Sequence, residues 1–495
     1  MKKPIVWSIA GVDPTGLAGS NVDLEIFKHF NVEACAIIAA VTAQKTSGVT
    51  AIESISAEHV AAQCNALQQE FKPNSIKIGM LGTIGTHEKI LQFLTRYSGF
   101  VVLDPILDFS SGNSLIFINE KQHISSLINL FPHVDVVTPN RMEAEIILNR
   151  TLKSYADIQE AAHSILALGA KSVLLKGGHV NDALLSQDYW TNGQESFWVA
   201  NQRLPNKNYR GTGCTLSSAI AACLALGYTI KDAIVIAKMY VNRGIRNSID
   251  ITQHTAKLFH NGWPETQIDL PYLASSPLLR LPPPFKPCRP IGLYPVVDSS
   301  YWLEELLPLG VQCIQLRIKN LQGKQLEEEI KRSILLAKKF RATLFINDYW
   351  ELAIRFGAEG VHLGQEDIHE ADNDKIHQSG LYLGVSTHCY YEVAAAHTFN
   401  PSYIACGPIY STTSKIMPFN PQGIEQLHRW RRTLQYPLVA IGGINLERLL
   451  SVLETGVEGI SLISAITKAN VPCNVTQQFL KIIRDYGNDQ PLLTC

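Results

Sequence analysis

The sequence predicts two α/β domains, of which the second is an eight-stranded β/α barrel. Three observations lead to this expectation: the length of 495 residues, a proline-rich stretch past the middle, and short apolar runs that alternate with amphipathic stretches on both sides of it. Single cores rarely grow beyond roughly 250 to 300 residues, so this chain is expected to form more than one. Short apolar runs separated by amphipathic stretches are typical of parallel strands joined by crossover helices.

Prolines recur between Pro264 and Pro290 and are densest in residues 281–290. Because proline fixes φ and lacks the backbone N–H, this spacing excludes regular helix and favours extended chain. At about 3.1 Å per residue, such a segment reaches on the order of 30 Å. We therefore expect a first domain over residues 1–270, a proline-rich linker over 271–290 that holds the domains apart, and a second domain over 291–485.

The second domain contains eight strand-like runs, most of them separated by a helical stretch. They cover residues 291–297, 313–318, 343–347, 360–364, 382–387, 403–409, 438–443 and 459–464. This is the pattern of a (β/α)8 barrel, whose active site lies at the C-terminal ends of the strands. Polar or glycine residues gather at these ends: Gln315, Arg317, Lys319, Asn347, Asp348, Asp367, Ser386, Gly442, Gly443 and Ser464.

Composition limits the classes of partner. The net charge is -1, with 43 basic and 44 acidic residues, which argues against nucleic acid or an anionic membrane and favours small-molecule substrates. The ten cysteines form no CxxC pair, so reduced thiols in a cytoplasm are expected, and no secretory signal is apparent. The uncharged stretch 211–230 is expected to be a buried helix rather than a membrane span. A homo-oligomer remains open.

In the first domain, Gly211-Thr212-Gly213-Cys214-Thr215 leads into a helix of small residues. Glycines allow successive N–H groups to turn inward, and the beginning of a helix adds a positive dipole end, so this segment is suited to hold an anion. Phosphoryl transfer needs such a site for the charge on the transferred group.

Other segments of the first domain support the same chemistry. Asn140 and Glu143 lie one helical turn apart after a strand and are suited to position a Mg–phosphate unit through water. Lys176 follows the strand at 173–175, where a lysine can meet nucleotide phosphates. A loop of small residues, Gly11–Gly19, precedes Asp23. Each segment alone is more often an ordinary turn than a ligand site.

Taken in order, these motifs resemble the hydroxymethylpyrimidine (phosphate) kinases, over residues 4 to 270. The matching segments are Gly11–Gly19 with Asp23, Thr42-Ala43-Gln44, Lys77-Ile78-Gly79-Met80, Leu103-Asp104-Pro105, Thr138-Pro139-Asn140, Lys176-Gly177-Gly178-His179 and Gly211–Thr215. The resemblance implies a ribokinase-like α/β sandwich. It also implies ATP- and Mg2+-dependent phosphorylation of the hydroxymethyl group of the thiamine pyrimidine, and then of the monophosphate.

The same resemblance implies individual roles. Asp23 and Gln44 would hold the aminopyrimidine, with Gly11 and Met80 lining its pocket. Cys214 would be the catalytic base, its thiolate favoured by the helix N-terminus. The residues implied at ATP and its phosphates are Asn140, Glu143, Lys176, Gly211, Thr212 and Gly213.

Three residues depart from the family pattern. Leu17 and Ser20 stand where glycine and an apolar residue are usual, which bears on acceptance of both free and phosphorylated pyrimidine. Arg210 stands where histidine often precedes the GTGC segment, and we expect it to add phosphate affinity.

In the second domain, the cations Arg317, Lys319 and Lys415 and the carboxylates Asp348 and Asp367 are expected around the barrel mouth, where together they can hold a Mg–pyrophosphate. Gly442-Gly443 and Ile463-Ser464 follow strands seven and eight, where this fold places a monophosphate. Two phosphate sites in one barrel predict the joining of two phosphorylated substrates.

These residues belong to motifs that are very similar to thiamine phosphate synthases, from about residue 290 to 480. The motifs are Gly292–Asp298, Gln315–Lys319, Phe345–Asp348, Gly360–Asp367, Gly384–His388, Gly407–Tyr410 and Ile441–Ile444. The similarity implies that the nitrogen of thiazole phosphate displaces pyrophosphate from the pyrimidine diphosphate, through a pyrimidine cation.

By the same similarity, Asp348 and Asp367 would bind Mg2+. The pyrimidine diphosphate would meet Gln315, Arg317, Lys319, Asn347, Ser386 and Lys415. Thiazole phosphate would meet Thr412, Ser414, Gly443, Ile463 and Ser464, although the family usually has threonine at Ser414. We expect His362 and His388 to pack or hydrogen-bond rather than act as acid–base groups, because loss of pyrophosphate at a metal needs little proton transfer.

Two alternatives remain open. The first domain is alternatively a kinase of a pyridoxal-type vitamin, and the barrel is alternatively a non-catalytic, ligand-binding relative of the synthase. The presence of Asp348, Asp367, Arg317 and Lys415 argues against the second alternative.

Overall fold

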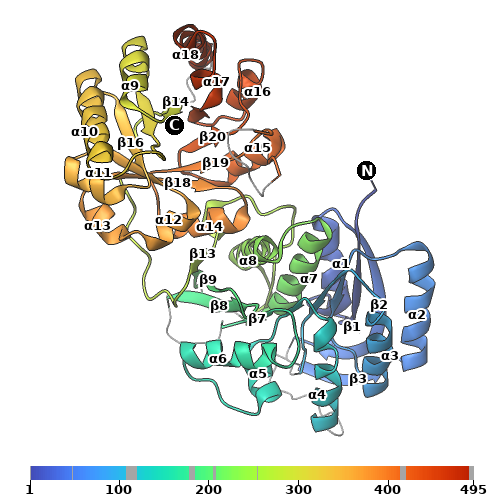
Figure 1. Ribbon diagram of the computed structural model, residues 1–495. Helices are drawn as coiled ribbons and strands as arrows, with labels where there is room; N and C mark the ends of the chain where they lie inside the picture. The colour runs from blue at the N-terminus through green and yellow to red at the C-terminus, as the bar shows by residue number, and fades with distance from the viewer. Residues whose placement is uncertain are drawn as a thin grey trace. The chain divides into compact units, whose positions relative to one another are not determined.

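The computed structural model describes residues 2–46, 48–107, 120–177, 184–204, 208–253, 255–412 and 420–489. The chain divides into two compact units (Figure 1). Unit 1 comprises residues 1–264 and 268–281, and unit 2 comprises residues 265–267 and 282–495. Each unit is described by itself below.

Unit 1 is built on a ten-stranded sheet in the order β13-β9-β8-β7-β6-β5-β4-β1-β2-β3. Six central strands run parallel, and β3, β8, β9 and β13 run antiparallel to their neighbours. The strands are β1 (Ile5–Val12), β2 (Glu33–Lys45), β3 (Gly48–Ser54), β4 (Ser75–Ile78), β5 (Phe100–Leu103), β6 (Val136–Val137), β7 (Val173–Leu175), β8 (Leu185–Thr191), β9 (Ser196–Gln202) and β13 (Tyr272–Ala274).

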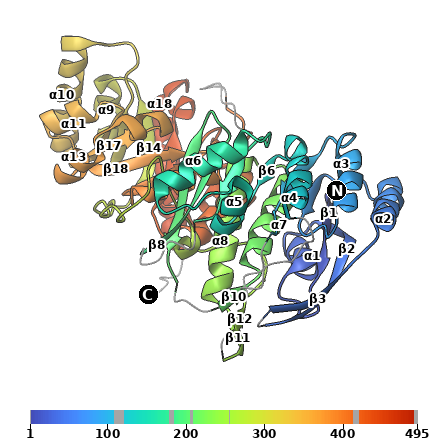
Figure 2. The same cartoon turned by 90° about the horizontal axis from the view of Figure 1, so that it is seen from below.

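Helices cover both faces of this sheet, which gives three layers (Figure 2). One face packs against α1 (Gly19–His29), α7 (Thr212–Ala225) and α8 (Ile230–Arg246). The other face is covered by α2 (Ala57–Glu70), α3 (Ile84–Leu94), α4 (Glu120–Ile128), α5 (Arg141–Leu148) and α6 (Tyr155–Leu166). The sandwich predicted for the first domain is therefore confirmed.

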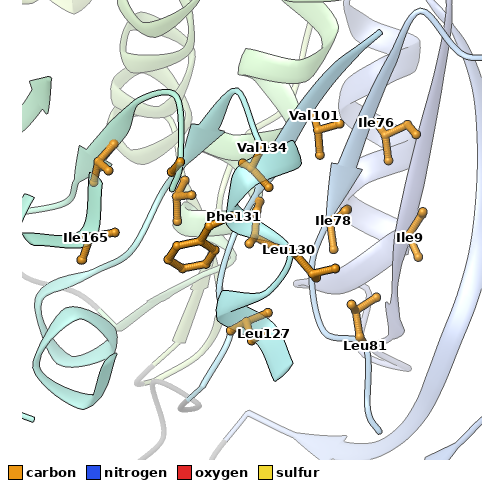
Figure 3. Close-up of a cluster of buried hydrophobic side chains, with 14 of the residues drawn as sticks. Ile9, Ile76, Ile78, Leu81, Val101, Leu127, Leu130, Phe131, Val134 and Ile165 are labelled. Atoms are coloured by element: carbon orange, nitrogen blue, oxygen red, sulfur yellow. The ribbon is translucent and has the colours of Figure 1, made fainter. Parts of the chain in front are cut away.

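Strand β1 shows why the sheet must be covered twice. Ile5, Trp7 and Ile9 belong to the core under α2 to α6, whereas Val6 and Ala10, which alternate with them, are equally buried. Successive side chains of a strand point to opposite faces, so both faces of β1 are apolar and buried. Figure 3 shows Ile9 beside Ile76, Ile78 and the other members of this core.

The uncharged stretch 211–230 forms α7 and the turn that follows it. Every residue from Cys214 to Leu224 is buried, which confirms the predicted buried helix. Among the described residues, no helix is both long and apolar enough to cross a membrane. A small sheet of β10 (Asn208–Arg210), β12 (Thr255–Lys257) and β11 (Ile249–Thr252) lies before α7 and after α8 in the chain.

Unit 2 is a closed barrel of eight parallel strands, as predicted. The strands are β14 (Gly292–Val297), β15 (Cys313–Leu316), β16 (Thr343–Asn347), β17 (Gly360–Leu363), β18 (Tyr382–Thr387), β19 (Tyr403–Cys406), β20 (Leu438–Ile441) and β21 (Gly459–Leu462). The helices around it are α9 (Ser300–Leu306), α10 (Gly323–Phe340), α11 (Trp350–Phe356), α12 (Gln365–Glu370), α13 (Asn373–Gln378), α14 (Tyr390–Thr398), α15 (Gly423–Thr433), α16 (Leu449–Leu453), α17 (Ser464–Thr467) and α18 (Pro472–Asp489).

Aromatic rings fill the barrel interior. Tyr294, Phe345 and Tyr403 pack edge to face, with ring centroids 5.1 to 5.9 Å apart. Glycines on adjacent strands leave room for these rings, because a Cβ on Gly384 would collide with the ring of Tyr403 and a Cβ on Gly360 would lie 2.5 Å from that of Phe345. The glycines are therefore part of the packing of this core.

The linker predicted over residues 271–290 is wrong in two respects. Residues 272–274 form β13, which pairs with β9 at the edge of the sheet of unit 1. Residues 282–290 cluster with unit 2: Phe285 is 7% exposed, its N–H donates to the carbonyl of Asn400, and its ring packs edge to face on His377. Proline spacing excludes helix but not strand pairing or burial, so it could not locate the true boundary.

We predict that Phe285→Ala destabilises unit 2 by about 3 kcal/mol, because the truncation removes a buried ring from the packed segment. The change is checked by urea unfolding of the full chain, followed through hydrogen exchange of barrel peptides. Leu279→Ala is the control, since Leu279 is 83% exposed and should leave unfolding unchanged. Equal stability of the two variants would contradict the prediction.

Candidate active sites

Two glycine-rich loops of unit 1 meet at the beginning of α7. Gly211 precedes the helix with φ of 80°, and a Cβ at this position would collide with the carbonyl of Leu17. Gly19, with φ of 66°, would likewise collide with the carbonyl of Gly11. The GTGC segment and the Gly11–Gly19 loop, which lie 200 residues apart in the sequence, therefore form one site.

A buried ion pair lies beside this site. Lys77 on β4 donates to both carboxylate oxygens of Asp23 on α1, at 3.0 and 2.9 Å, and neither side chain is exposed. Ser8 and Ser218 also donate to Asp23, at 2.5 and 2.6 Å. Burial by itself lowers the pKa of Lys77, but the Asp23 carboxylate outweighs it and raises this pKa above its usual value.

The contact of Asp23 with an aminopyrimidine stays a prediction, and the structure shows which protein groups hold this side chain. Its four hydrogen bonds all go to protein groups, and its side chain is fully buried. A carboxylate has about four lone-pair sites, so a ligand would have to displace one of these donors. Asp23 is paired with Lys77 because a buried carboxylate needs a positively charged partner.

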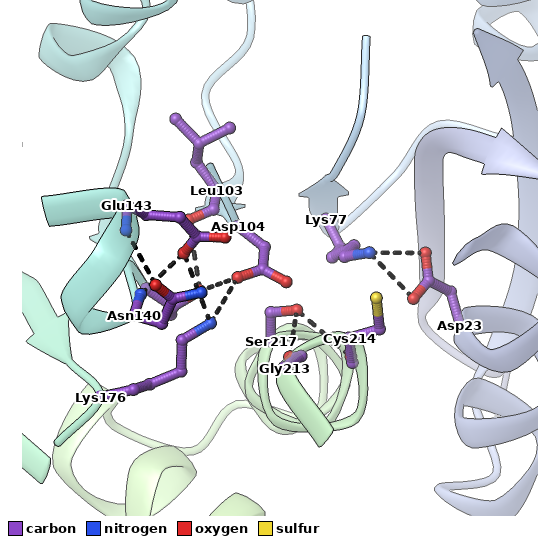
Figure 4. Close-up of polar contacts among 11 residues, drawn as sticks. Asp23, Lys77, Leu103, Asp104, Asn140, Glu143, Lys176, Gly213, Cys214 and Ser217 are labelled. Atoms are coloured by element: carbon purple, nitrogen blue, oxygen red, sulfur yellow. Dashed lines mark hydrogen bonds and ion pairs between the residues drawn. The ribbon is translucent and has the colours of Figure 1, made fainter. Parts of the chain in front are cut away.

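A second group of charges lies on the other side of the beginning of α7 (Figure 4). Lys176 donates to Asp104 at 2.8 Å and lies 4.0 Å from Glu143. Thr138 donates to Asp104 at 3.1 Å. A Cβ on Gly213 would lie 3.1 Å from Nζ of Lys176, so this ammonium group lies against the GTGC segment. The contact of Lys176 with nucleotide phosphates stays a prediction.

Asn140 and Glu143 also come together as predicted. They form a capping box at the beginning of α5, in which Glu143 N–H donates to Asn140 and Asn140 N–H donates to Glu143. The arrangement orients a carboxylate 4.0 Å from the ammonium group of Lys176. Burial acts to raise the pKa of Asp104, but the positive charges of Lys176 and Lys77 outweigh burial. The pKa of Asp104 therefore lies below its usual value.

Cys214 is the third residue of α7, and its sulfur lies between the two groups of charges in Figure 4. The thiolate predicted here is not favoured in this structure. Burial raises the pKa of Cys214 to about 11; Lys77 and the N–H of Gly19 act against this rise, whereas Asp23 and Asp104 add to it. Low-dielectric surroundings disfavour the charged form more than the helix N-terminus favours it.

Three of the four residues predicted at the pyrimidine, Gly11, Gln44 and Met80, have neighbours close to the end of β1. A Cβ on Gly11 would collide with the terminal methyl of Met80, so these two residues are in contact. Gln44 lies on β2, and its side-chain oxygen is 3.4 Å from the hydroxyl of Thr42, which also donates to Val12 at the end of β1. Gly11 and Met80, the two predicted lining residues, are therefore neighbours, and the contact of Gln44 with the pyrimidine stays a prediction.

The three departures from the family pattern have different surroundings. Leu17 and Ser20 are buried, at 4% and 1% exposure, so their side chains pack within the protein. Arg210 is 4% exposed and directly precedes Gly211, and its Nη1 atom has no hydrogen-bond partner among the described residues. Burial lowers the pKa of Arg210, and Asp13 is the charge that opposes this change.

Sequence reasoning assigned no role to Lys77 or Asp104, although both stand in motifs that were compared with the kinase family. The available signal was charge inside a strand: Lys77 belongs to the four-residue strand β4, whose residues are all buried, and Asp104 directly follows the buried strand β5. A charge at such a position needs a partner, and here each has one.

The mouth of the barrel in unit 2 brings three predicted residues together. Lys319 lies 2.5 Å from Asp348, and Asp367 is a near neighbour of Asp348. Burial, and then Asp348, raise the pKa of Asp367. Asp348 has φ of 66°, a left-handed conformation that is uncommon outside glycine, and such conformations gather at functional sites.

The fit of these carboxylates to Mg2+ follows from their closeness. Two carboxylates in contact repel unless a proton or a cation lies between them. Mg2+ is usually held by one or two carboxylates, water and substrate phosphates, so this pair is sufficient. Among the described residues, no group of three or more His, Cys, Asp or Glu side chains is placed to hold a metal on its own.

The remaining predicted diphosphate residues line the same strand ends. Gln315 and Asn347 are buried, at 4% and 6% exposure, whereas Arg317 and Ser386 are partly exposed. Gln315 donates to the hydroxyl of Tyr294 at 3.1 Å, so its amide nitrogen is held by the protein. Lys415, predicted to complete this set, lies outside the described residues.

The predicted thiazole phosphate residues follow β19, β20 and β21. Gly443 has φ of 64°, and a Cβ there would lie 2.5 Å from the carbonyl of Ser411, so the loop that carries Thr412 passes next to it. Ile463 directly precedes α17 and Ser464 begins it. Ser414 lies outside the described residues.

Both histidines form hydrogen bonds, as expected. His362 bridges Tyr403 and Ser386, at 2.6 and 2.7 Å, and burial lowers its pKa to about 4. His388 lies 2.6 Å from Glu392 on α14. A histidine with such a low pKa is neutral near pH 7, which makes His362 a poor proton donor.

Comparison with known proteins agrees with this geometry. The family model for phosphomethylpyrimidine kinase matches residues 13–258, and that for thiamine monophosphate synthase matches residues 293–466. The thiamine-phosphate synthase of Photorhabdus laumondii is 53% identical over 202 residues, covering 40% of this chain and 94% of that protein. That of Yersinia pestis is 53% identical over 194 residues, covering 39% and 90%.

Solved structures resemble unit 1. Pyridoxal kinase from Staphylococcus aureus in complex with AMP-PCP has a TM-score of 0.50 at 25% identity, covering 55% of this chain and 98% of that one. Phosphomethylpyrimidine kinase from Clostridium difficile 630 is 33% identical with a TM-score of 0.43, covering 48% and 98%. The chain belongs to the thiamine-phosphate synthase family through its barrel, carries a phosphomethylpyrimidine kinase domain before it, and is thus a bifunctional enzyme of thiamine biosynthesis.

Proposed function

We propose that unit 1 transfers the γ-phosphate of ATP to the hydroxymethylpyrimidine and to its monophosphate, giving the diphosphate. The observation that carries this proposal is the position of Lys176, whose ammonium group lies against Gly213 at the beginning of α7. The N–H groups at the beginning of α7 and Lys176 bind the transferred phosphate. Cys214 accepts the proton of the acceptor hydroxyl or phosphate.

Asp23 and Asp104 take supporting roles in this proposal. Asp23 holds Lys77 beside Cys214, and Asp104 holds Lys176 against the GTGC segment. The pyrimidine itself binds at Gly11, Gln44 and Met80. Glu143, next to Lys176 and oriented by Asn140, holds Mg2+ through water. When bound, this ion screens the charge of the ATP phosphates.

We further propose that unit 2 couples the pyrimidine diphosphate with thiazole phosphate. The observation that carries this proposal is the contact of Asp348 with Asp367 and Lys319 at the barrel mouth. Asp348 and Asp367 would hold Mg2+, which would supply positive charge to stabilise the leaving pyrophosphate. Arg317, Lys319, Asn347, Ser386 and Lys415 bind the pyrophosphate oxygens, and Gln315, whose amide is held by Tyr294, lines the diphosphate site. As the C–O bond to pyrophosphate breaks, the thiazole nitrogen forms the new C–N bond.

Thiazole phosphate binds at the loops after β19, β20 and β21 in this proposal. Thr412, Ser414, Gly443, Ile463 and Ser464 surround its phosphate, where this barrel fold commonly binds one. Gly443 supports the assignment, because its contact with Ser411 brings two of these loops together.

A pyridoxal-type substrate is the second candidate for unit 1, because pyridoxal kinases share its fold. The match of residues 13–258 to the phosphomethylpyrimidine kinase family favours the pyrimidine. The barrel also favours it, since a synthase needs the diphosphate that such a kinase makes. Incubation with ATP, Mg2+, hydroxymethylpyrimidine and thiazole phosphate should yield thiamine phosphate; absence of product even from supplied diphosphate would contradict the synthase proposal.

We predict that Cys214→Ala lowers kinase turnover about 100-fold or more while leaving the coupling of supplied pyrimidine diphosphate intact. Asp348→Ala should abolish coupling and leave the kinase active. Cys223→Ala is the matched control, since Cys223 is a second buried thiol on α7, away from its beginning. If both activities fell together in each variant, the assignment of one activity to each unit would be wrong.

The raised pKa of Cys214 predicts the pH dependence of the kinase. A base with a pKa of about 11 is protonated at neutral pH, so kcat/KM should rise about tenfold per pH unit between pH 6 and 9. The slope of kcat/KM against pH reports an ionisation of the free enzyme, and steady-state assays between pH 6 and 9 measure this slope. A flat profile would show that Cys214 does not supply the titrating group.

Arg210 is predicted to bind a phosphate group, because the Nη1 atom of its buried guanidinium, beside the GTGC segment, has no partner within the part of the chain that the structure describes. Replacing it with histidine, the usual family residue, should raise the KM for the pyrimidine monophosphate or for ATP about tenfold. The KM for ATP, measured with free hydroxymethylpyrimidine as the acceptor, separates these two ligands, since this reaction involves no acceptor phosphate. Unchanged KM values in both Arg210→His and Arg210→Ala would refute this role.

A further inference from the structure

A continuous chain of side-chain hydrogen bonds runs through the barrel and ends at Ser386. Gln315 Nε2 donates to the hydroxyl of Tyr294 at 3.1 Å, and the hydroxyls of Tyr294 and Tyr403 are 2.7 Å apart. The Tyr403 hydroxyl lies 2.6 Å from Nδ1 of His362, and Nε2 of His362 lies 2.7 Å from Oγ of Ser386. The chain therefore links four strands to a residue of the proposed pyrophosphate site.

The chain is buried except at its outer end. Gln315, Tyr294, Tyr403 and His362 are at most 5% exposed, whereas Ser386 is partly exposed. A buried hydroxyl whose proton has no acceptor is costly, so each proton in this chain must have a place. Within the described residues, the Tyr294 hydroxyl meets only Gln315 and Tyr403, and that of Tyr403 meets only Tyr294 and His362.

Because each tyrosine hydroxyl has only two partners among the described residues, the direction of every hydrogen bond in the chain follows. An amide nitrogen only donates, so Tyr294 accepts from Gln315 and has a single acceptor, Tyr403, for its own proton. Tyr403 must then donate to Nδ1 of His362. A ring nitrogen that accepts carries no proton, so the imidazole is neutral and its proton is on Nε2. Nε2 donates to Ser386, whose own hydroxyl proton has no acceptor within the described residues.

We propose that His362 is a positioning residue, held as its Nε2–H tautomer by Gln315, Tyr294 and Tyr403, which turns the Ser386 hydroxyl into a donor for the pyrophosphate oxygens of the bound pyrimidine diphosphate. Those oxygens only accept, so a serine that had to donate its proton to histidine could not bind them. The inference rests on the proposed synthase function.

The opposite proton order is the alternative that the experiment must separate. If His362 carried its proton on Nδ1, it would donate to Tyr403, and Nε2 would accept the Ser386 proton. In that order Tyr403 would donate to Tyr294 and Tyr294 to Gln315, whose amide would present its oxygen instead of its nitrogen. The two orders therefore share the same heavy-atom positions and differ in the direction of every hydrogen bond in the chain. The tautomer of this one ring therefore decides the role of Ser386.

The first test is the 15N spectrum of the histidine rings in the full-length protein. Long-range correlations distinguish the two tautomers, and we expect His362, identified by its loss in His362→Asn, to show the Nε2–H pattern. Tyr403→Phe should abolish this preference, because Nδ1 loses its donor. An Nδ1–H pattern in the unaltered protein would overturn the proposal. This readout needs no activity, so it stands even if the synthase assignment fails.

The second test is kinetic and uses supplied pyrimidine diphosphate. Tyr403→Phe should lower kcat/KM for the diphosphate about tenfold and leave the KM for thiazole phosphate unchanged. In a Ser386→Ala background the same substitution should have no further effect, because it acts through Ser386. Additive losses would overturn the proposal. If the unaltered protein formed no thiamine phosphate, the proposed function would fail instead.

Tyr436→Phe provides the matched control. Its hydroxyl lies 2.8 Å from Nδ1 of the buried His397, so the substitution breaks a similar Tyr–His hydrogen bond in the same unit but outside the chain. We expect this variant to keep the kinetic constants of the unaltered protein. An equal loss in Tyr436→Phe and Tyr403→Phe would mean that lost packing, rather than proton order, explains the effect.

Discussion

The buried ion pairs beside the beginning of α7 are the constraint on which the kinase site depends. Asp23, Lys77, Asp104 and Lys176 come from α1, β4, and the segments after β5 and β7, and each charge meets its partner within 3.0 Å. Removing one partner of a buried pair leaves an uncompensated charge, which costs roughly 3 to 5 kcal/mol. The two ion pairs therefore fix the positions of these four segments where the glycine loops meet.

These same pairs set the electrostatics of Cys214. The cation that lowers its pKa, Lys77, is already paired with Asp23, and a second carboxylate, Asp104, adds to the rise. The thiol is consequently protonated at neutral pH in the absence of substrate.

The polar groups inside the barrel of unit 2 are neutral rather than charged. Its interior holds hydroxyls, an amide and a neutral imidazole in one hydrogen-bonded chain, and the charged groups Lys319, Asp348 and Asp367 lie only at the mouth. Neutral groups need hydrogen-bond partners but no counter-charge, so they can fill a narrow aromatic core. The charges at the mouth remain available to an anionic ligand.

The sequence by itself determined the two α/β folds, the positions of the eight barrel strands and the residue types at their ends, because hydrophobic periodicity and glycine spacing are local properties. Only the tertiary structure decided which charges are paired. Asp23 is fully occupied by Lys77, Ser8 and Ser218, and Cys214 is buried deeply enough to stay protonated. Likewise, the direction of the chain that ends at Ser386 depends on contacts between residues up to 109 positions apart. Burial and the pairing of charges arise when segments distant in the sequence pack together, so no local sequence pattern predicts them.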